Sequence, residues 1–300
     1  MEPKFERVNS AEKQPESTFS TVPTITGENI KTEVLNLNLE KDKHLIDQVK
    51  EYVSANLSKI KNADKIALPG QAHASGIFLA LTEMIAGLPK KALLVVPGSE
   101  PVEINLSEWR HEASRDARGQ RIEGSASGKT FVLQGGHPIS ADQHLALAEE
   151  MGTTVENLVF VPFGDNKITT EEISGDGKNK IISALVEASQ KAGMTVGDWE
   201  SGKVAYAPAG LGALGTLQTT AIYGISGQWP NMIRLASNPE TRQFELAEVI
   251  GLQSLRQEGK NLEESGMIKM DKEMIKNLLE KIRSEFGNTP EFKMIEEKLN

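Results

Sequence analysis

Along residues 130–258, segments with the hydrophobic period of a strand alternate with segments that have the period of a helix. This pattern predicts strands that alternate with helices. Short runs of β-branched and aromatic residues predict the strands, and apolar residues spaced three or four apart predict the helices. The last two strands are separated by Ser237-Asn-Pro-Glu, which is typical of a tight turn. The expected strands are 130–134, 157–163, 203–207, 231–236 and 243–250, and the expected helices are 141–151, 178–192, a segment ending near 226, and a short helix that carries Arg256.

Strands that alternate with helices favour a mainly parallel sheet covered by helices on both faces. The sequence therefore predicts an α/β, Rossmann-like domain over 130–258, with an antiparallel β-hairpin at the edge of its sheet. The chain has 300 residues, so there is room for a second domain with its own core.

Residues 34–118 repeat the later part of this pattern. Gly70 and Gly87 are 17 residues apart and enclose a helical stretch, as do Gly210 and Gly227. We therefore predict a tandem duplication whose first copy is truncated, because it lacks the first strand and helix. The segments that match are 65–70 with 203–210, Pro89 with Pro230, and 104–112 with 250–258, while 34–39 and 43–57 would be the second strand and second helix of the first copy.

Three segments fall outside the two units. Residues 1–32 are polar and lack periodicity, so we expect a disordered tail. Glycine and serine dominate 119–129, which indicates a linker. Apolar residues recur at helical spacing in 259–300, which predicts one or two amphipathic helices that bury a stripe against the body or a partner.

Composition narrows the function classes. The formal net charge of −9 argues against binding to extended DNA or RNA, which needs a basic surface to release counterions. The absence of cysteine excludes disulfides, thiolate zinc sites and a cysteine nucleophile. The chain has no apolar run of 18 residues and no signal-peptide pattern, so we expect no membrane span and a cytoplasmic protein.

Three glycine-rich turns fall at the carboxyl ends of predicted strands, where open parallel sheets bind their ligands. The first and third turns precede helices, so free backbone N–H groups and the helix dipole favour an anion there. Glycine lets a phosphate approach the backbone, although any such fold also needs glycine at a strand–helix turn. The ligand-binding candidates from these turns are Gly135, Gly136, Gly164, Pro208, Gly210, Leu211 and Gly212.

Among the charged and titratable residues, His137 stands beside Gly135 and Gly136, and His73 occupies a comparable position in the first copy. His137 is either a chemical group or a capping and packing residue. Arg110 and Arg256 stand in the same register of the two copies and could bind phosphate or form an ion pair with a nearby carboxylate. No histidine pair has the spacing of a metal site, so we expect no metal and no cofactor.

Four motifs in this order resemble a known family. They are a strand followed by Gly-Gly-His137-Pro138, then Pro208-Ala-Gly-Leu, Gly224-x-x-Gly-x-Trp-Pro, and Ile250-Gly-Leu-x-x-x-Arg256. This set is similar to the Csx-type CRISPR-associated family numbered fifteen, which is grouped with the ring nucleases of type III systems. The chain departs from the family pattern at Gly136, Ala207, Ala209, Tyr223 and Gly251, where the family has serine, asparagine, proline, histidine and asparagine.

The resemblance implies a domain related to the CRISPR-associated ligand-sensing (CARF) fold that works as a homodimer or as a pseudo-dimer within one chain. It implies a cyclic oligoadenylate ligand, with cyclic tetra-adenylate as the favoured ring, that is cleaved or sequestered in antiviral defence. Cleavage would need no metal, because a ribose 2′-hydroxyl attacks its own phosphate while donors stabilise the charge. His137 and Arg256 would be catalytic, Arg110 would bind the ligand, and Lys167 or Lys203 would add charge. The alternative is a non-catalytic protein-interaction module without a nucleotide ligand.

Overall fold

The computed structural model describes residues 44–63, 65–94, 101–136, 138–163, 177–208, 212–238, 244–262, 264 and 280. The predicted tail 1–32, the predicted strand 34–39 and most of the predicted helices in 259–300 lie outside the described residues. No helix in the described part of the chain is long and apolar enough to cross a membrane.

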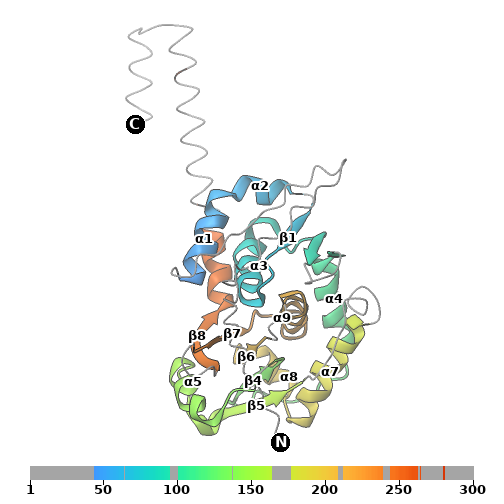
Figure 1. The fold of residues 1–300 in the computed structure, drawn as a ribbon. Helices are drawn as coiled ribbons and strands as arrows, with labels where there is room; N and C mark the ends of the chain where they lie inside the picture. Colours follow the sequence, from blue (N-terminus) through green and yellow to red (C-terminus); the bar gives the residue numbers. More distant parts are fainter. Residues whose placement is uncertain are drawn as a thin grey trace, which may run out of the picture.

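A five-stranded sheet forms the base of the molecule (Figure 1). Its strands lie in the order β5-β4-β6-β7-β8, and all neighbours are parallel except the final hairpin, β7 with β8. The predicted mainly parallel sheet with an antiparallel hairpin at its edge is confirmed. The strands are β4 (Thr130–Gln134), β5 (Leu158–Pro162), β6 (Val204–Ala207), β7 (Asn231–Ser237) and β8 (Phe244–Gly251).

Alternation along the strands gives this sheet two buried faces. Phe131 and Tyr206 point into the larger core, together with residues of α7 (Gly177–Lys191) and α9 (Gly212–Ser226). Val132 and Ala205 point the other way, into a smaller core that includes Leu147 of α5 (His144–Glu150). Helices therefore cover both faces, as the strand–helix alternation predicts. Three short helices complete this part: the 3₁₀ turns Ala141–Gln143 and Val155–Asn157, and α8 (Val196–Glu200).

Pro162 marks β5 as an edge strand. The Phe163 N–H donates to the Gln134 carbonyl of β4 (3.1 Å), so the backbone groups of Phe163 face β4. Successive residues of a strand direct these groups to opposite sides, so Leu158, Phe160 and Pro162 face outward. Proline has no N–H, so at this position no backbone donor is left without a partner on the outer side of β5. The missing donor also makes it harder for another strand to pair with this edge.

A three-stranded sheet, in the order β1-β2-β3, precedes the larger sheet in the chain. Here β1 and β2 are parallel, and β2 and β3 are antiparallel, which is also the pairing of β6, β7 and β8. Each series places a 15-residue helix after its first strand, α3 or α9, and a helix after its last. The first series consists of β1 (Ile66–Leu68), α3 (Ala72–Ala86), β2 (Ala92–Leu94), β3 (Val102–Ile104) and α4 (Leu106–Ala117). The second series consists of the corresponding elements β6, α9, β7, β8 and the helical residues 252–262.

Among the described residues, no strand of the smaller sheet takes the place that β4 takes in the larger one. In the larger sheet the Ala207 carbonyl accepts the Gly135 N–H (2.9 Å). The corresponding carbonyl, that of Pro69, accepts the Ser75 hydroxyl of α3 instead (2.7 Å). Pro69 also lacks an N–H, so the open edge of β1 leaves fewer unpaired backbone groups.

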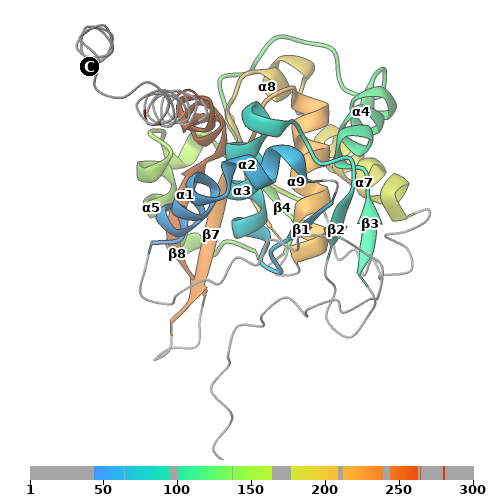
Figure 2. The same ribbon diagram turned by 90° about the horizontal axis from the view of Figure 1, so that it is seen from above.

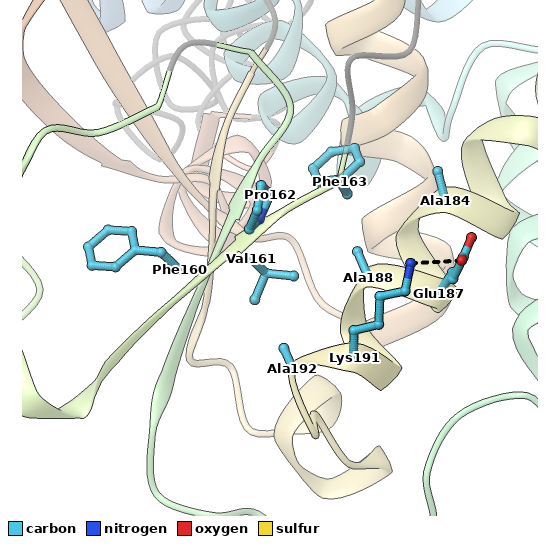
Figure 3. Close-up of a pocket in the computed structure, with 9 residues that line it drawn as sticks. All are labelled: Phe160, Val161, Pro162, Phe163, Ala184, Glu187, Ala188, Lys191 and Ala192. Atoms are coloured by element: carbon cyan, nitrogen blue, oxygen red, sulfur yellow. Dashed lines mark hydrogen bonds and ion pairs between the residues drawn. The ribbon is translucent and has the colours of Figure 1, made fainter.

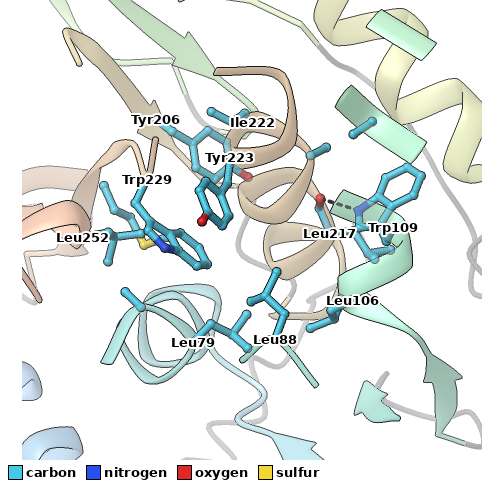
Figure 4. Close-up of a cluster of buried hydrophobic side chains, with 14 of the residues drawn as sticks. Leu79, Leu88, Leu106, Trp109, Tyr206, Leu217, Ile222, Tyr223, Trp229 and Leu252 are labelled. Atoms are coloured by element: carbon cyan, nitrogen blue, oxygen red, sulfur yellow. Dashed lines mark hydrogen bonds between the residues drawn. The ribbon is translucent and has the colours of Figure 1, made fainter. Parts of the chain in front are cut away.

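The two series pack reciprocally (Figures 1 and 2). α4 lies against α9 at Gly224, where a Cβ would overlap the Arg110 carbonyl. Residues 252–262 lie against α3 at Gly259, where a Cβ would overlap the Leu81 carbonyl. Each series thus places its final helix on the long helix of the other. One hydrophobic core, shown in part in Figure 4, includes residues from both.

The outer helices follow the same reciprocal arrangement. α7 packs on α9 and α4. α1 (Leu45–Ala55) packs on α3, and its Lys50 forms an ion pair with Glu258 of the helical residues 252–262. The helix predicted at 43–57 ends early, because the Asn56 side chain donates to the Tyr52 carbonyl (2.9 Å), and α2 (Leu57–Asn62) starts beyond it.

Residues 119–129, predicted as a linker, lie along α8. Ile122 forms a bridge with Thr195, and the Gly197 N–H donates to the Gly124 carbonyl (3.0 Å). The buried Asp198 carboxylate accepts the N–H and the hydroxyl of Ser127 (2.6 and 2.7 Å). These bonds fix the connection between the two series instead of leaving it as a free spacer.

Candidate functional site

The larger sheet has its topological switch point between β4 and β6. From β4 the chain continues to β5 on one side, and from β5 it crosses to β6 on the other. In open α/β sheets this crevice, beyond the carboxyl ends of the strands, is the usual ligand site. Gly135 and Gly136 follow β4, and Pro208 follows β6, so three predicted residues border the switch point.

Gly135 is required by packing. A Cβ at this position would lie 3.0 Å from Gln218 Oε1, Phe163 Cζ and Tyr206 Cε2. Gln218 is fixed in place because it accepts a hydrogen bond from the Tyr206 hydroxyl (2.5 Å). The structural explanation for a glycine at a strand–helix turn therefore holds for Gly135, while Gly136 is exposed. The candidates His137, Gly164, Lys167, Gly210 and Leu211 lie outside the described residues.

Gly212 brings the N-terminus of α9 against the N-terminus of α3. It is the first residue of α9, and a Cβ on it would overlap the backbone carbonyl of Gly70, in the turn before α3. The N-termini of α3 and α9 therefore lie side by side. Each N-terminus carries unpaired N–H groups and the positive end of a helix dipole, and both features attract anions. This face of the chain therefore offers two adjacent positions for negatively charged groups.

His73 does not add charge to this face. Its Nε2 lies 3.1 Å from the Ile233 carbonyl of β7, which places the ring between α3 and the larger sheet. Burial lowers the pKa of His73, against the opposing effect of that hydrogen bond. The imidazole is therefore neutral at neutral pH and acts as a contact between the two series.

Arg110 and Arg256 lie at the opposite end of the long helices and meet at one carboxylate, that of Glu83 in α3. Arg256 Nε donates to Glu83 Oε2 (2.7 Å), and Arg110 Nη1 lies 3.8 Å from Glu83 Oε1. Of the two roles that the sequence leaves open for the arginines, the structure places both in the ion pair. It does not bring them to the glycine turns, since the eleven positions from Gly212 to Tyr223 span roughly 16 Å.

Glu83 also accepts hydrogen bonds from two aromatic residues. The Tyr223 hydroxyl of α9 donates to Oε1, and Trp229 Nε1 donates to Oε2 (2.8 Å). The two rings stack with centroids 4.5 Å apart, and the Arg110 guanidinium lies 4.3 Å from the Tyr223 centroid (Figure 4 shows the rings). Four side chains from both series thus surround a carboxylate that is only 9% exposed. We call these four residues, together with Glu83, the Glu83 cluster.

Sequence reasoning missed Glu83, although a signal was present. It is the single charged side chain between 74 and 86 in an apolar helix, and it stands 13 residues after Gly70, as Tyr223 stands 13 after Gly210. Lys203, by contrast, precedes β6 and lies at the amino end of the sheet, where its Nζ is 3.4 Å from the Gly128 carbonyl. It therefore cannot add charge at the strand-end turns.

The Glu83 cluster predicts a tyrosine that resists ionisation. Burial raises the pKa of Tyr223 to about 12, and the hydrogen bond and charge of Glu83 add to the shift. The contribution of this phenol to stability is complete below about pH 10 and is lost as the pH rises towards 12. We expect the difference in absorbance at 295 nm between the wild type and Tyr223→Phe to titrate near pH 12, and a midpoint near 10 would contradict the cluster.

A cavity of about 430 Å³ lies on the flank of the larger sheet, between β5 and α7 (Figure 3). Val161 and Pro162 line one wall, and Ala184 and Ala188 line the other, beside an ion pair between Glu187 and Lys191 (2.8 Å). None of the predicted site residues lines it. Within the described ranges, no group of three or more acidic or histidine side chains could hold a metal ion.

Comparison of the chain with protein-family models, with curated proteins and with solved structures gives no match. The resemblance to the Csx-type family therefore stays a prediction.

Proposed function

We propose that this chain binds a cyclic oligoadenylate, with cyclic tetra-adenylate as the leading candidate, at the paired N-termini of α3 and α9. The observation that carries the proposal is the contact of Gly212 with the Gly70 carbonyl, which joins two helix N-termini at one face. A ring of repeating phosphates has two-fold symmetry, and each N-terminus offers N–H donors to one side of it.

We further propose that the two series are copies of one unit, and that they act as a pseudo-dimer within the chain. Their shared strand pairing, equal long helices and reciprocal final helices support this view. A small ligand also suits the net charge of −9, since a few aligned donors can hold a phosphate where a basic surface is absent. In the described part of the first series no strand stands in the place of β4, so Gly135 and Gly136 have no counterparts there and the two halves of the site differ.

The direct test is to incubate the purified chain with labelled cyclic tetra-adenylate in EDTA. We expect retention of the ring on the protein at micromolar concentration. Linear products would identify a metal-independent ring nuclease, whereas stable retention would identify a protein that sequesters the messenger. If no ring binds, the proposal is wrong and the protein-interaction module is favoured instead.

Two glycine substitutions locate the site. Gly212→Ala should weaken ring binding by about ten-fold or more, because the new Cβ forces the two helix N-termini apart. Gly251→Ala is the matched control, since a Cβ there makes only ordinary contacts (3.5 Å and beyond) beside Asn231, at the amino end of β7. Circular dichroism must show that both variants are folded. Equal affinities of the two variants would place the ring elsewhere.

A further inference from the structure

α3 and α9 lie side by side along their whole length. They start together, where Gly212 contacts the Gly70 backbone, and they end together, where Tyr223 bonds to Glu83. Each is followed by a glycine with positive φ, Gly87 (74°) and Gly227 (73°), whose N–H donates to the carbonyl of Glu83 or Tyr223. The two helices are therefore parallel and are held at both ends.

The bonds at the second end are concentrated on one residue. Glu83 accepts from Tyr223, Trp229 and Arg256, all of which belong to the second series, while Arg110 comes from the first. A carboxylate this buried is retained only when donors compensate its lost hydration. Removing its charge would leave two arginines, each 33% exposed, facing one another across a neutral group.

We propose that Glu83 is a positioning residue that sets the alignment of α3 against α9, and through it the spacing of the two helix N-termini. Rigid helices transmit a shift at one end to the other, because packed side chains do not deform continuously. The link to ligand binding rests on the proposed function, whereas the effect on the alignment of the helices does not.

The test measures alignment and affinity separately. The chain contains no cysteine, so spin labels on Glu51→Cys of α1 and Asn179→Cys of α7, both exposed, report the distance between the two series. We expect one narrow distance distribution in the labelled parent and a broadened or displaced one after Glu83→Gln. Glu108→Gln, which removes an exposed carboxylate from α4, should leave the distribution unchanged.

Affinity is measured for cyclic tetra-adenylate and for linear di-adenylate, which engages one turn at a time. Glu83→Gln should weaken ring binding by about three- to thirty-fold, the range expected for coupling through a packed network, and leave di-adenylate binding unchanged. A general loss of folding would instead weaken both ligands equally. That result, or unchanged affinities with an unchanged distance, would overturn the proposal.

An exchange of side chains provides a second variant. Positions 83 and 223 correspond in the two series, and Arg110 lies over position 223 as Arg256 lies beside position 83. The double change Glu83→Tyr with Tyr223→Glu should therefore recover the narrow distance distribution, and failure to recover it counts against the alignment role. If the wild type binds no ring, the proposed function fails, and the spin-label distances alone decide whether Glu83 sets the alignment.

Discussion

Replacing Gly259 with alanine is expected to lower the free energy of unfolding by about 2–3 kcal/mol. Alanine normally improves a helix by about 1 kcal/mol over glycine, so the sign of the effect is diagnostic. At Gly259 a Cβ would overlap the Leu81 carbonyl of α3, and backbone atoms can relieve the overlap only if the helices separate. Urea denaturation followed by circular dichroism measures the change.

Two further variants complete this comparison. Gly224→Ala should show a similar loss, because a Cβ there would overlap the Arg110 carbonyl at the reciprocal contact. Gln257→Ala, on the exposed side of the same helical residues 252–262, should change stability by less than about 0.5 kcal/mol. If Gly259→Ala were as stable as Gln257→Ala, the close packing of the final helix on α3 would be wrong.

Replacing Asp198 with asparagine is expected to destabilise the chain by about 2–4 kcal/mol, because the carboxylate holds the connection between the two series. One oxygen accepts both Ser127 donors, and the other accepts the Thr195 N–H (3.0 Å). An asparagine would turn an NH₂ group towards one of these sets, so that donors would face donors at a part-buried contact. Thermal unfolding of the two proteins at pH 7 gives the difference.

The pH dependence of this effect has a defined sign. Burial alone would raise the pKa of Asp198, but the hydrogen bonds from Thr195 and Ser127 outweigh it, so the pKa lies below its ordinary value. The stabilisation is therefore present above the pKa of the unfolded chain, about 3.9, and is lost as the pH falls below that value. The difference in stability between Asp198→Asn and the wild type should therefore shrink steadily as the pH falls below about 3.9. A constant difference across this range would contradict the assignment, and Glu149→Gln, at an exposed position of α5, is the control.

The sequence was most informative where one period dominates a segment. Strand alternation over 130–134 predicts both faces of β4, since Phe131 and Val132 enter different cores. The spacing of Gly70 and Gly87 predicts α3 and its glycine end, because only a residue tolerant of positive φ continues the chain there. Five-residue α8 has too little length for a periodic signal, and it was not predicted.

The candidate site was harder to predict, because its contacts join residues distant in sequence. Gly135 and Gly212 could be selected from local turn chemistry. The roles of Arg110 and Arg256 depend on a carboxylate more than 25 positions away from either, and local sequence cannot identify that partner. The length of α9 also separates the arginines from the turns, which only the placement of both helix ends reveals.

If the two series are copies of one unit, as proposed above, the pairing of Glu83 with Tyr223 has a consequence for how the copies can diverge. In a homodimer, a position beside the symmetry axis meets its own copy, so a glutamate there would face a second glutamate and the two charges would repel. A fused chain encodes the two sides separately, and an acid on one side can be matched by a phenol on the other. Each side can then mutate alone, so one half can keep a reactive turn while the other becomes a fixed support.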